Sequence, residues 1–255
     1  MQLLLEAWIY IAENTKRKIV RWKPGTDQVQ VVAGQGAQVN GVDDLGDCLV
    51  VAVSPKGEIV VGDINNKRLV KFGDGQGEVL IEEKGKPFFS PNGILYMISK
   101  NGEQVRRLDG AMLRSVIASD DLPQEQQFRA NRCVASKDEV IYLSDNRNKR
   151  ILRLSPGDSE VTIVGSAAAE RDLCGLTLDG EIVYVADEAL HKIWSFRVGE
   201  SVGQTALDLT HIDGAWPSDV LVQDGSMYVL YRPLGGGFVS RHPLPAPINL
   251  EPVPT

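Results

Sequence analysis

Four acid–base pairs recur at one spacing along the chain and are its first candidates for chemistry. In each pair a carboxylate stands five positions before a cation: Glu13 with Lys18, Asp63 with Arg68, Asp145 with Arg150, and Asp187 with Lys192. A carboxylate beside a cation can form a salt bridge or, in a catalytic site, move a proton. Because only four residues separate the two members, each pair is expected to close a tight loop. The spacing therefore favours structural clamps over catalysis.

Each pair lies inside a 14-residue window that the chain repeats. Clear copies begin at residues 9, 59, 141 and 183, and weaker copies begin at 95 and 227. The carboxylate holds position five of the window and the cation holds position ten. The weaker copies lose both partners together, with Ser99 and Gln104 in one and Tyr231 and Gly236 in the other. Successive windows start 36 to 50 residues apart, a period that fits one four-stranded blade of a β-propeller.

The residues around each window supply the strands of a blade. A short apolar run and a turn precede the window, whose two halves read as a hairpin, and Pro-Gly or Asp-Gly turns lead to a further apolar run. The sequence predicts an all-β, six-bladed β-propeller of four-stranded antiparallel blades. One domain is expected over residues 1–255, with residues 2–5 as the first inner strand and 248–253 as the last outer strand. The expected blades cover residues of about 1–46, 47–85, 86–128, 129–170, 171–215 and 216–255.

The windows resemble the NHL repeat. In that pattern a strand ends in Asp, a polar loop with Asn, His or Lys follows, and a cation precedes an aliphatic residue. The clearest copies are Asn65-Asn66-Lys67-Arg68-Leu69 and His191-Lys192-Ile193. The resemblance covers essentially the whole chain, strongly in four repeats and weakly in the third and sixth. It implies a six-bladed fold and an interaction platform for proteins, sometimes for RNA.

Charge is distributed unevenly along the chain. Its net charge is −7, but the six windows hold 16 Lys and Arg against six Asp and Glu. Because the windows occupy the same part of each blade, we expect a basic zone and an acidic remainder. Such a zone could dock an acidic protein, including one at the periphery of a membrane complex, or an anionic membrane surface. RNA is third in rank, because few aromatic residues accompany the zone. The residues expected to form it are Lys16, Arg17, Arg21, Lys67, Lys71, Arg106, Arg107, Arg147, Lys149 and Arg153.

A metal site is the main alternative for chemistry. Related six-bladed propellers include calcium-dependent lactonases and gluconolactonase-like hydrolases, which hold a metal at the channel mouth through Glu, Asn and Asp. Here Asn131 and Asp219 are the weak candidates at the channel mouth, and they do not complete an oxygen-ligand set. The element Ser90-Pro91-Asn92-Gly93 reads as ordinary turn chemistry. No cofactor is expected.

The leading hypothesis is therefore a non-enzymatic NHL-type scaffold for other proteins. Such a scaffold could be a peripheral subunit of a larger assembly. A calcium-dependent hydrolase is second and an RNA-binding module third. The three cysteines are expected to be buried thiols, since they show no metal-ligand spacing. No apolar stretch has the length of a membrane span and no signal peptide is readable, so the chain is expected to be soluble. Its compartment, its partner and any leader before Met1 stay open.

Overall fold

The structure is a computed structural model that describes most of the chain. The described residues are 8–34, 41–42, 44–47, 49–73, 76–136, 138–155, 158, 160–166, 172–200, 202–212, 216–232 and 237–245, with the backbone alone at 131, 133, 135 and 166. Nearly all regular structure in this part is β-strand. The two helices are single 3-10 turns, η1 (Asn14–Lys16) and η2 (Ser119–Asp121). Neither these nor any other described segment forms a helix long and apolar enough to cross a membrane.

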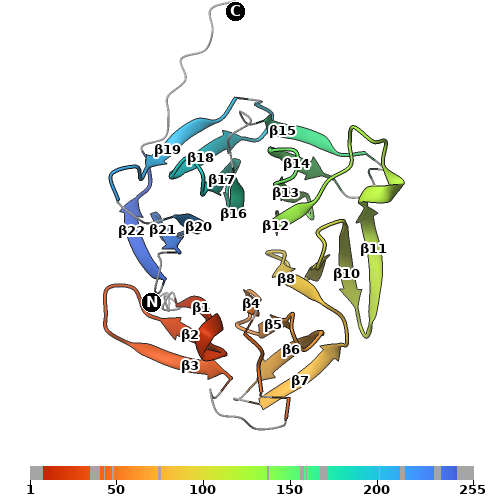
Figure 1. Cartoon of the computed structure of the whole chain (residues 1–255), viewed down its shortest axis with the longest axis vertical. Helices are drawn as coiled ribbons and strands as arrows, with labels where there is room; N and C mark the ends of the chain where they lie inside the picture. Colours follow the sequence, from red (N-terminus) through yellow and green to blue (C-terminus); the bar gives the residue numbers. More distant parts are fainter. Residues whose placement is uncertain are drawn as a thin grey trace, which may run out of the picture.

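The strands form six antiparallel sheets that stand around a common centre (Figure 1). The first sheet contains β1 (Ile9–Glu13), β2 (Lys18–Trp22) and β3 (Val29–Ala33). The second contains β4 (Leu49–Val53), β5 (Ile59–Asp63), β6 (Arg68–Gly73) and β7 (Gln76–Ile81). The third contains β8 (Gly85–Phe89), β9 (Leu95–Ser99), β10 (Gln104–Asp109) and β11 (Met112–Ala118).

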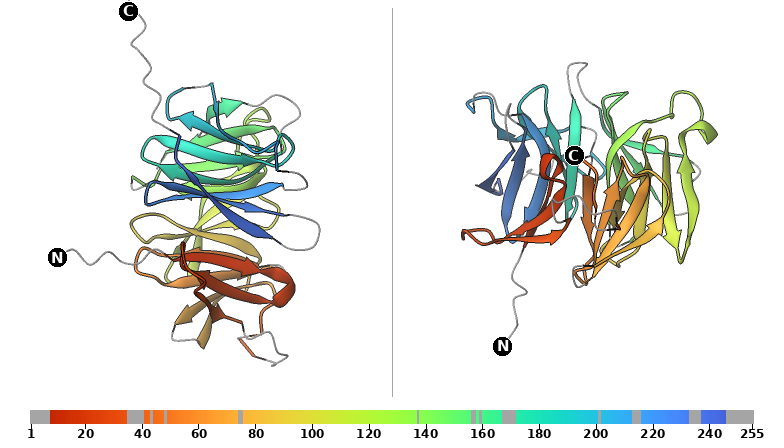
Figure 2. Two further views of the ribbon diagram at one scale, coloured as in Figure 1. Left: turned by 90° about the vertical axis from the view of Figure 1, so that its left-hand side faces the viewer. Right: turned by 60° about the horizontal axis from the view of Figure 1, so that its bottom comes forward.

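The second half of the chain repeats this order. The fourth sheet contains β12 (Ala130–Ala135), β13 (Ile141–Asp145), β14 (Arg150–Leu154) and β15 (Thr162–Ser166). The fifth contains β16 (Leu173–Asp179), β17 (Ile182–Asp187), β18 (Lys192–Arg197) and β19 (Gln204–Asp208). The sixth contains β20 (Pro217–Gln223), β21 (Ser226–Tyr231) and β22 (Phe238–Pro243). This radial array of antiparallel sheets, seen from the side in Figure 2, is a β-propeller.

Each 14-residue window forms two neighbouring strands, as the repeat predicts. Position five ends the first strand and position ten begins the second in every clear copy, so that Asp63 pairs with Arg68 and Asp145 with Arg150 in the strand register. Four sheets have the expected four strands, whereas the first and last have three described strands. The additional strands expected at 2–5 and 248–253 lie outside the described residues.

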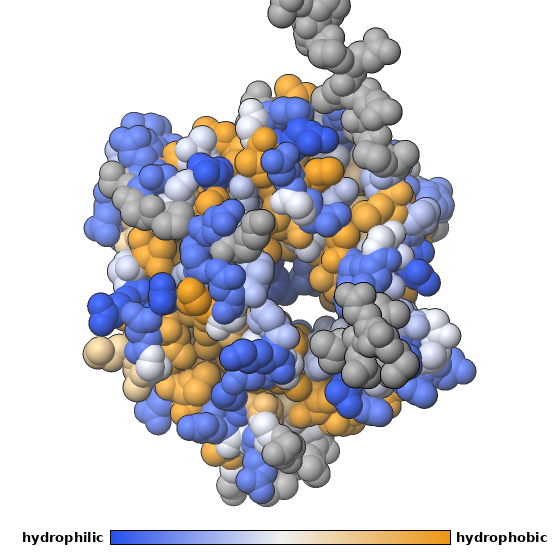
Figure 3. All heavy atoms as spheres, turned by 180° about the vertical axis from the view of Figure 1, so that it is seen from behind, coloured by the Kyte–Doolittle hydropathy of each residue, from blue (hydrophilic) through white to orange (hydrophobic). Residues whose placement is uncertain are grey.

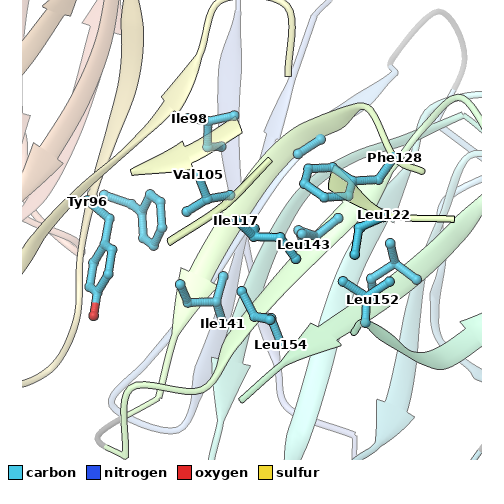
Figure 4. Packing of buried hydrophobic residues seen from close by; sticks show 13 residues of the cluster. Tyr96, Ile98, Val105, Ile117, Leu122, Phe128, Ile141, Leu143, Leu152 and Leu154 are labelled. Carbon is cyan, nitrogen blue, oxygen red and sulfur yellow. The ribbon is translucent and has the colours of Figure 1, made fainter. Parts of the chain in front are cut away.

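The hydrophobic core is divided among the junctions between consecutive sheets. Five clusters of buried residues join sheets one to two, two to three, three to four, four to five and five to six. The cluster between the third and fourth sheets is the largest, and in Figure 4 Tyr96, Ile98 and Val105 face Ile141 and Leu143 across it. Because successive side chains of a strand point to opposite faces and the buried ones pack against neighbouring sheets, the ring of sheets is held by packing between blades.

Candidate functional site

The carboxylate of Asp145 is the centre of a buried clamp. Its side chain is fully buried and accepts hydrogen bonds from the backbone N–H of Arg129 at 3.0 Å, the amide of Asn148 at 2.8 Å and Nε of Arg150 at 2.9 Å. Arg150 in turn donates to the carbonyls of Glu125 and Gln127, both at 2.8 Å. The pair therefore joins the window loop to the connection that leads into the inner strand of the same sheet.

The second sheet repeats this clamp with different residues. Asp63 is fully buried and accepts from the backbone N–H of Gly46, the amide of Asn66 and Nε of Arg68. Arg68 donates to the carbonyls of Val42 and Asp44, at 3.0 and 2.8 Å. Both oxygens of the buried carboxylate accept hydrogen bonds from the loops, and the guanidinium donates to the carboxylate and to loop carbonyls. These two pairs support the clamp interpretation, and neither presents a free acid or base for catalysis.

The other two predicted pairs are built differently. Glu13 is half-exposed and accepts from both Lys16 and Lys18 at 3.0 Å. Burial would raise the pKa of Glu13, but the two ammonium groups outweigh it and lower that pKa. In the fifth sheet, Asp187 accepts from the indole N–H of Trp194 at 3.0 Å, while Lys192 lies 3.5 Å from Asp208. In this sheet Trp194 donates to the carboxylate as arginine does elsewhere, and the direct Asp187–Lys192 clamp stays a prediction.

The loops of the four clear windows share an unusual backbone conformation at position nine. Arg17, Lys67, Lys149 and His191 have φ between 52° and 57°, the left-handed region that is uncommon for residues with a side chain. The conformation turns the chain back into the second strand and exposes the side chain of Arg17 and Lys67. Sequence reasoning missed this feature, although a basic residue or His at position nine in all four copies is its visible trace.

Asparagine at position six links each of two loops to the next sheet. Oδ1 of Asn14 accepts from the N–H of Leu49 at 2.7 Å, and Oδ1 of Asn146 accepts from the N–H of Leu173 at 3.1 Å. The window loops therefore lie at the same end of the molecule as the connections into the inner strands. We call this end the loop face and define it by the loops 14–17, 64–67, 100–103, 146–149 and 188–191.

The ten residues expected to form one basic zone are divided between two parts of the molecule. Lys16, Arg17, Lys67, Arg147 and Lys149 lie in the loops of the loop face. Arg106 lies in the middle of β10, and the other four are near the opposite ends of their strands: Arg21, Lys71, Arg107 and Arg153. The zone inferred from the windows is thus not a single surface, because a window covers the full length of two strands.

Most of these cations already have partners. Lys16 pairs with Glu13, Lys71 with Glu58, Arg106 with Glu83 and Arg107 with Asp109. Arg21 donates to Gln30 and stacks on Trp8, and Lys149 donates to Asn146. In the described part of the chain, Arg17, Lys67, Arg147 and Arg153 make no ion pair.

Two lysines outside the predicted set complete a cluster on the loop face. Gly85 pairs with Ser99 across β8 and β9, so the next residues outward, Lys84 and Lys100, leave the two strands side by side. The ammonium of Lys100, together with burial and the ammonium of Lys67, lowers the pKa of Lys84. No carboxylate among the described residues pairs with these three lysines, which we call the lysine cluster. The three lysines are far apart in the sequence, so sequence reasoning did not find this cluster.

Of the two candidate metal ligands, the structure describes the side chain of Asp219. Asp219 lies at the central channel, where Oδ2 is 3.7 Å from the guanidinium of Arg132. The side chain of Asn131 lies outside the described part. No group of three His, Cys, Asp or Glu residues suited to a metal ion occurs among the described residues.

The turn at Ser90-Pro91-Asn92-Gly93 joins β8 to β9, as expected of ordinary turn chemistry. It also contacts the next sheet, because Ser90, Asn92 and the hydroxyl of Tyr96 all donate to the carboxylate of Glu139. Burial, followed by this carboxylate, raises the pKa of Tyr96. The turn is therefore a link between the third and fourth sheets at the end opposite the loop face.

Comparison with known proteins identifies the fold alone. No protein-family model and no curated protein sequence matches the chain. Among solved structures, similarity extends to virginiamycin B lyase from Staphylococcus aureus, at 13% identity and a TM-score of 0.65, over 98% of this chain and 84% of the lyase. A gluconolactonase from Xanthomonas campestris matches at 14% identity and 0.60, over 77% and 75%. A nidogen–laminin complex matches at 13% identity and 0.67, over 91% and 92%. All three similarities are to β-propellers.

Proposed function

We propose that the chain is a six-bladed, NHL-like propeller that serves as a non-enzymatic platform for other proteins, and that its loop face docks a partner with an acidic surface. The lysine cluster is the observation that carries this proposal. Two of its members emerge side by side from β8 and β9, and the described residues supply no carboxylate to neutralise them. The propeller found in the nidogen–laminin complex shows that such a scaffold can serve protein binding.

The electrostatics of the cluster favour an anionic partner. Like charges held close together repel one another, so Lys67, Lys84 and Lys100 cost the free protein stability. A carboxylate-rich surface removes that repulsion on binding and raises the rate of association. The rest of the chain is acidic, which disfavours non-specific attraction of nucleic acid. An assembly in which this propeller is a peripheral subunit would satisfy these requirements.

The proposal is tested by charge reversal at the cluster, with poly-L-glutamate as the probe. The variant Lys84→Glu/Lys100→Glu should bind the probe at least tenfold more weakly than the wild type in surface plasmon resonance. Wild-type binding should fall as NaCl is raised from 50 to 300 mM, because exposed charges are screened within about 8 to 10 Å at physiological salt. Crosslinking with mass spectrometry in extract from the native source should place partner contacts on the same lysines.

The matched control is Lys56→Glu/Arg153→Glu, which reverses two cations away from the loop face. Lys56 is exposed in the turn between β4 and β5, and Arg153 lies near the opposite end of β14. The control should keep probe binding within twofold of the wild type. Equal losses in both double variants, or binding that ignores salt, would remove the loop face as the docking surface.

A channel hydrolase of the lactonase type is the second candidate. Two observations favour it: the shared fold with a gluconolactonase and the position of Asp219 at the central channel. Hydrolysis of glucono-1,5-lactone that depends on added calcium, and that Asp219→Asn abolishes, would establish this function in place of the platform.

A further inference from the structure

One position in each of five described inner strands lies beside the central channel. In each of these strands, one residue pairs with position five of the window, and the residue two places further along the strand belongs to what we call the channel ring. The ring residues are Val51, Pro87, Arg132, Gly175 and Asp219. Four of these line a central cavity of about 190 Å³, and the remaining one is a glycine. The repeat thus places chemically different residues at equivalent places on one wall.

The polar part of this ring is built by distortions of the inner strands. The pairing register shifts beside Arg132 in β12, beside Gly175 in β16 and beside Asp219 in β20, whereas β4 and β8 pair with their neighbours without a shift. Such bulges re-aim side chains and are frequent next to binding sites. The buried hydroxyl of Ser144 supports two of them, since it accepts the N–H of Arg132 at 3.1 Å and donates to the carbonyl of Cys174 at 3.0 Å.

Gly175 allows the two charged members of the ring to meet. Arg132 and Asp219 belong to the fourth and sixth sheets, and the inner strand of the fifth sheet lies between them. A Cβ atom at Gly175 would lie 1.8 Å from Oδ1 of Asp219, so any side chain there would displace the carboxylate. The glycine therefore holds open the place that Asp219 occupies.

Arg132 is only loosely engaged by its partner. The closest approach of its guanidinium to Asp219 is 3.7 Å, which is longer than a hydrogen bond. Within the described structure the guanidinium donates no hydrogen bond to another residue, and 30% of its side chain is exposed. A planar guanidinium with unused donors can hold a carboxylate through two parallel hydrogen bonds.

The lining of the cavity restricts the class of ligand. Lys86 and Arg132 contribute cationic groups to this lining, and Asp219 contributes a carboxylate. The rest of the wall is mainly apolar, with Val51, Val53, Pro87, Phe88, Phe89, Ile98 and Leu176. The space exceeds what one water molecule needs, and the opening is visible at the centre of Figure 3.

From this geometry we propose that the central channel binds a small monocarboxylate with an apolar body. The carboxylate takes the free donors of the Arg132 guanidinium, and the apolar body packs on Val51, Val53 and Phe89. Asp219 orients Arg132 and competes with the ligand for it. This site is separate from the loop face and does not depend on the platform function.

Benzoate and benzamide provide a matched pair of probes, because they share shape and size but only benzoate carries a charge. Isothermal titration calorimetry should show benzoate binding at least tenfold more tightly than benzamide. Arg132→Gln should weaken benzoate at least tenfold and leave benzamide unchanged. The control Arg153→Gln, which removes an arginine of β14 outside the channel, should leave both affinities unchanged.

A second variant decides the matter even if Arg132→Gln fails to fold. Asp219→Asn removes the competing carboxylate and should tighten benzoate binding severalfold without affecting benzamide. Benzoate bound no more tightly than benzamide would overturn the proposal. So would undiminished benzoate affinity in folded Arg132→Gln, or unchanged or weaker benzoate affinity in Asp219→Asn.

Discussion

At the scale of single residues, the clamp of the fourth sheet owes its importance to burial. Exposed ion pairs contribute little to stability, but Asp145 is fully buried and the side chain of Arg150 is 10% exposed. Asp145→Ala leaves Nε of Arg150 and the N–H of Arg129 without their acceptor. We expect the free energy of unfolding to fall by about 3 kcal/mol, measured by urea denaturation followed by circular dichroism.

The chain itself supplies the control for this change. At the same two positions the third sheet has Ser99 and Gln104, where the hydroxyl of Ser99 accepts the N–H of Gln104 at 3.1 Å. The double variant Asp145→Ser/Arg150→Gln transfers that neutral arrangement to the fourth sheet and should be more stable than Asp145→Ala. A single variant as stable as the wild type would show that the clamp contributes nothing.

Cys174 gives a second prediction at this scale. The thiol is buried, as the absence of ligand spacing predicted, and donates to the carboxylate of Glu188 at 3.3 Å. Burial, followed by Glu188, raises the pKa of Cys174 to about 12, so the reactive thiolate is scarce at neutral pH. In the variant Cys48→Ser/Cys133→Ser, Cys174 is the remaining thiol. At pH 8 it should react with Ellman's reagent at least 100-fold more slowly in the folded protein than in protein unfolded by guanidinium chloride.

The same variant with Glu188→Gln separates electrostatics from access. Removing the carboxylate should speed the reaction of the folded protein and move its pH dependence to lower pH. A folded thiol that reacts as fast as the denatured one would contradict the assigned environment.

At the scale of elements, the window loops store backbone strain at position nine. Arg17 has φ of 52° and no ion pair among the described residues, so its side chain gives little in return for the left-handed conformation. Glycine adopts that conformation without a steric penalty. Arg17→Gly should therefore raise the free energy of unfolding by up to about 1 kcal/mol, as the left-handed region costs other residues about 1 to 2 kcal/mol.

Arg147 provides the comparison for this prediction. It is also an exposed arginine of a window loop without an ion pair in the described structure, but its φ is not positive. Arg147→Gly should lower the free energy of unfolding by about 0.5 to 1 kcal/mol, because glycine there only adds freedom to the unfolded chain. Equal effects of the two glycines in urea denaturation would remove the strain argument.

The elements also show what the sequence could and could not predict. The paired strands of each window were predictable, because the apolar pattern and the acid–base spacing are local and repeat. The partners of the cations were not, since Glu83 reaches Arg106 from the preceding connection and Asp208 of the outer strand lies beside Lys192. The channel ring was also hidden, because bulges depend on backbone pairing that leaves no fixed residue pattern.

At the scale of the whole molecule, the division of the core among junctions makes the ring uneven. The second to fifth sheets each take part in two of the five buried clusters, whereas the first and sixth sheets each take part in one. Among the residues that the structure describes, none of these clusters joins the sixth sheet to the first. Local opening of a protein requires least free energy where buried apolar contacts are fewest.

We therefore expect the ring to open first between its first and sixth sheets. In native-state hydrogen exchange read by mass spectrometry, amides of β2 and β21 should exchange before those of β9, β10, β13 and β14, which flank the largest cluster. The comparison uses only strands that are paired on both sides within their sheets, so exposed edge strands do not bias it. Leu143→Ala, which empties a fully buried position in that cluster, should cost about 2 to 5 kcal/mol and reduce the difference between the two groups. Equal protection of both groups in the wild type would mean that contacts beyond the five clusters close the ring as firmly as its other junctions.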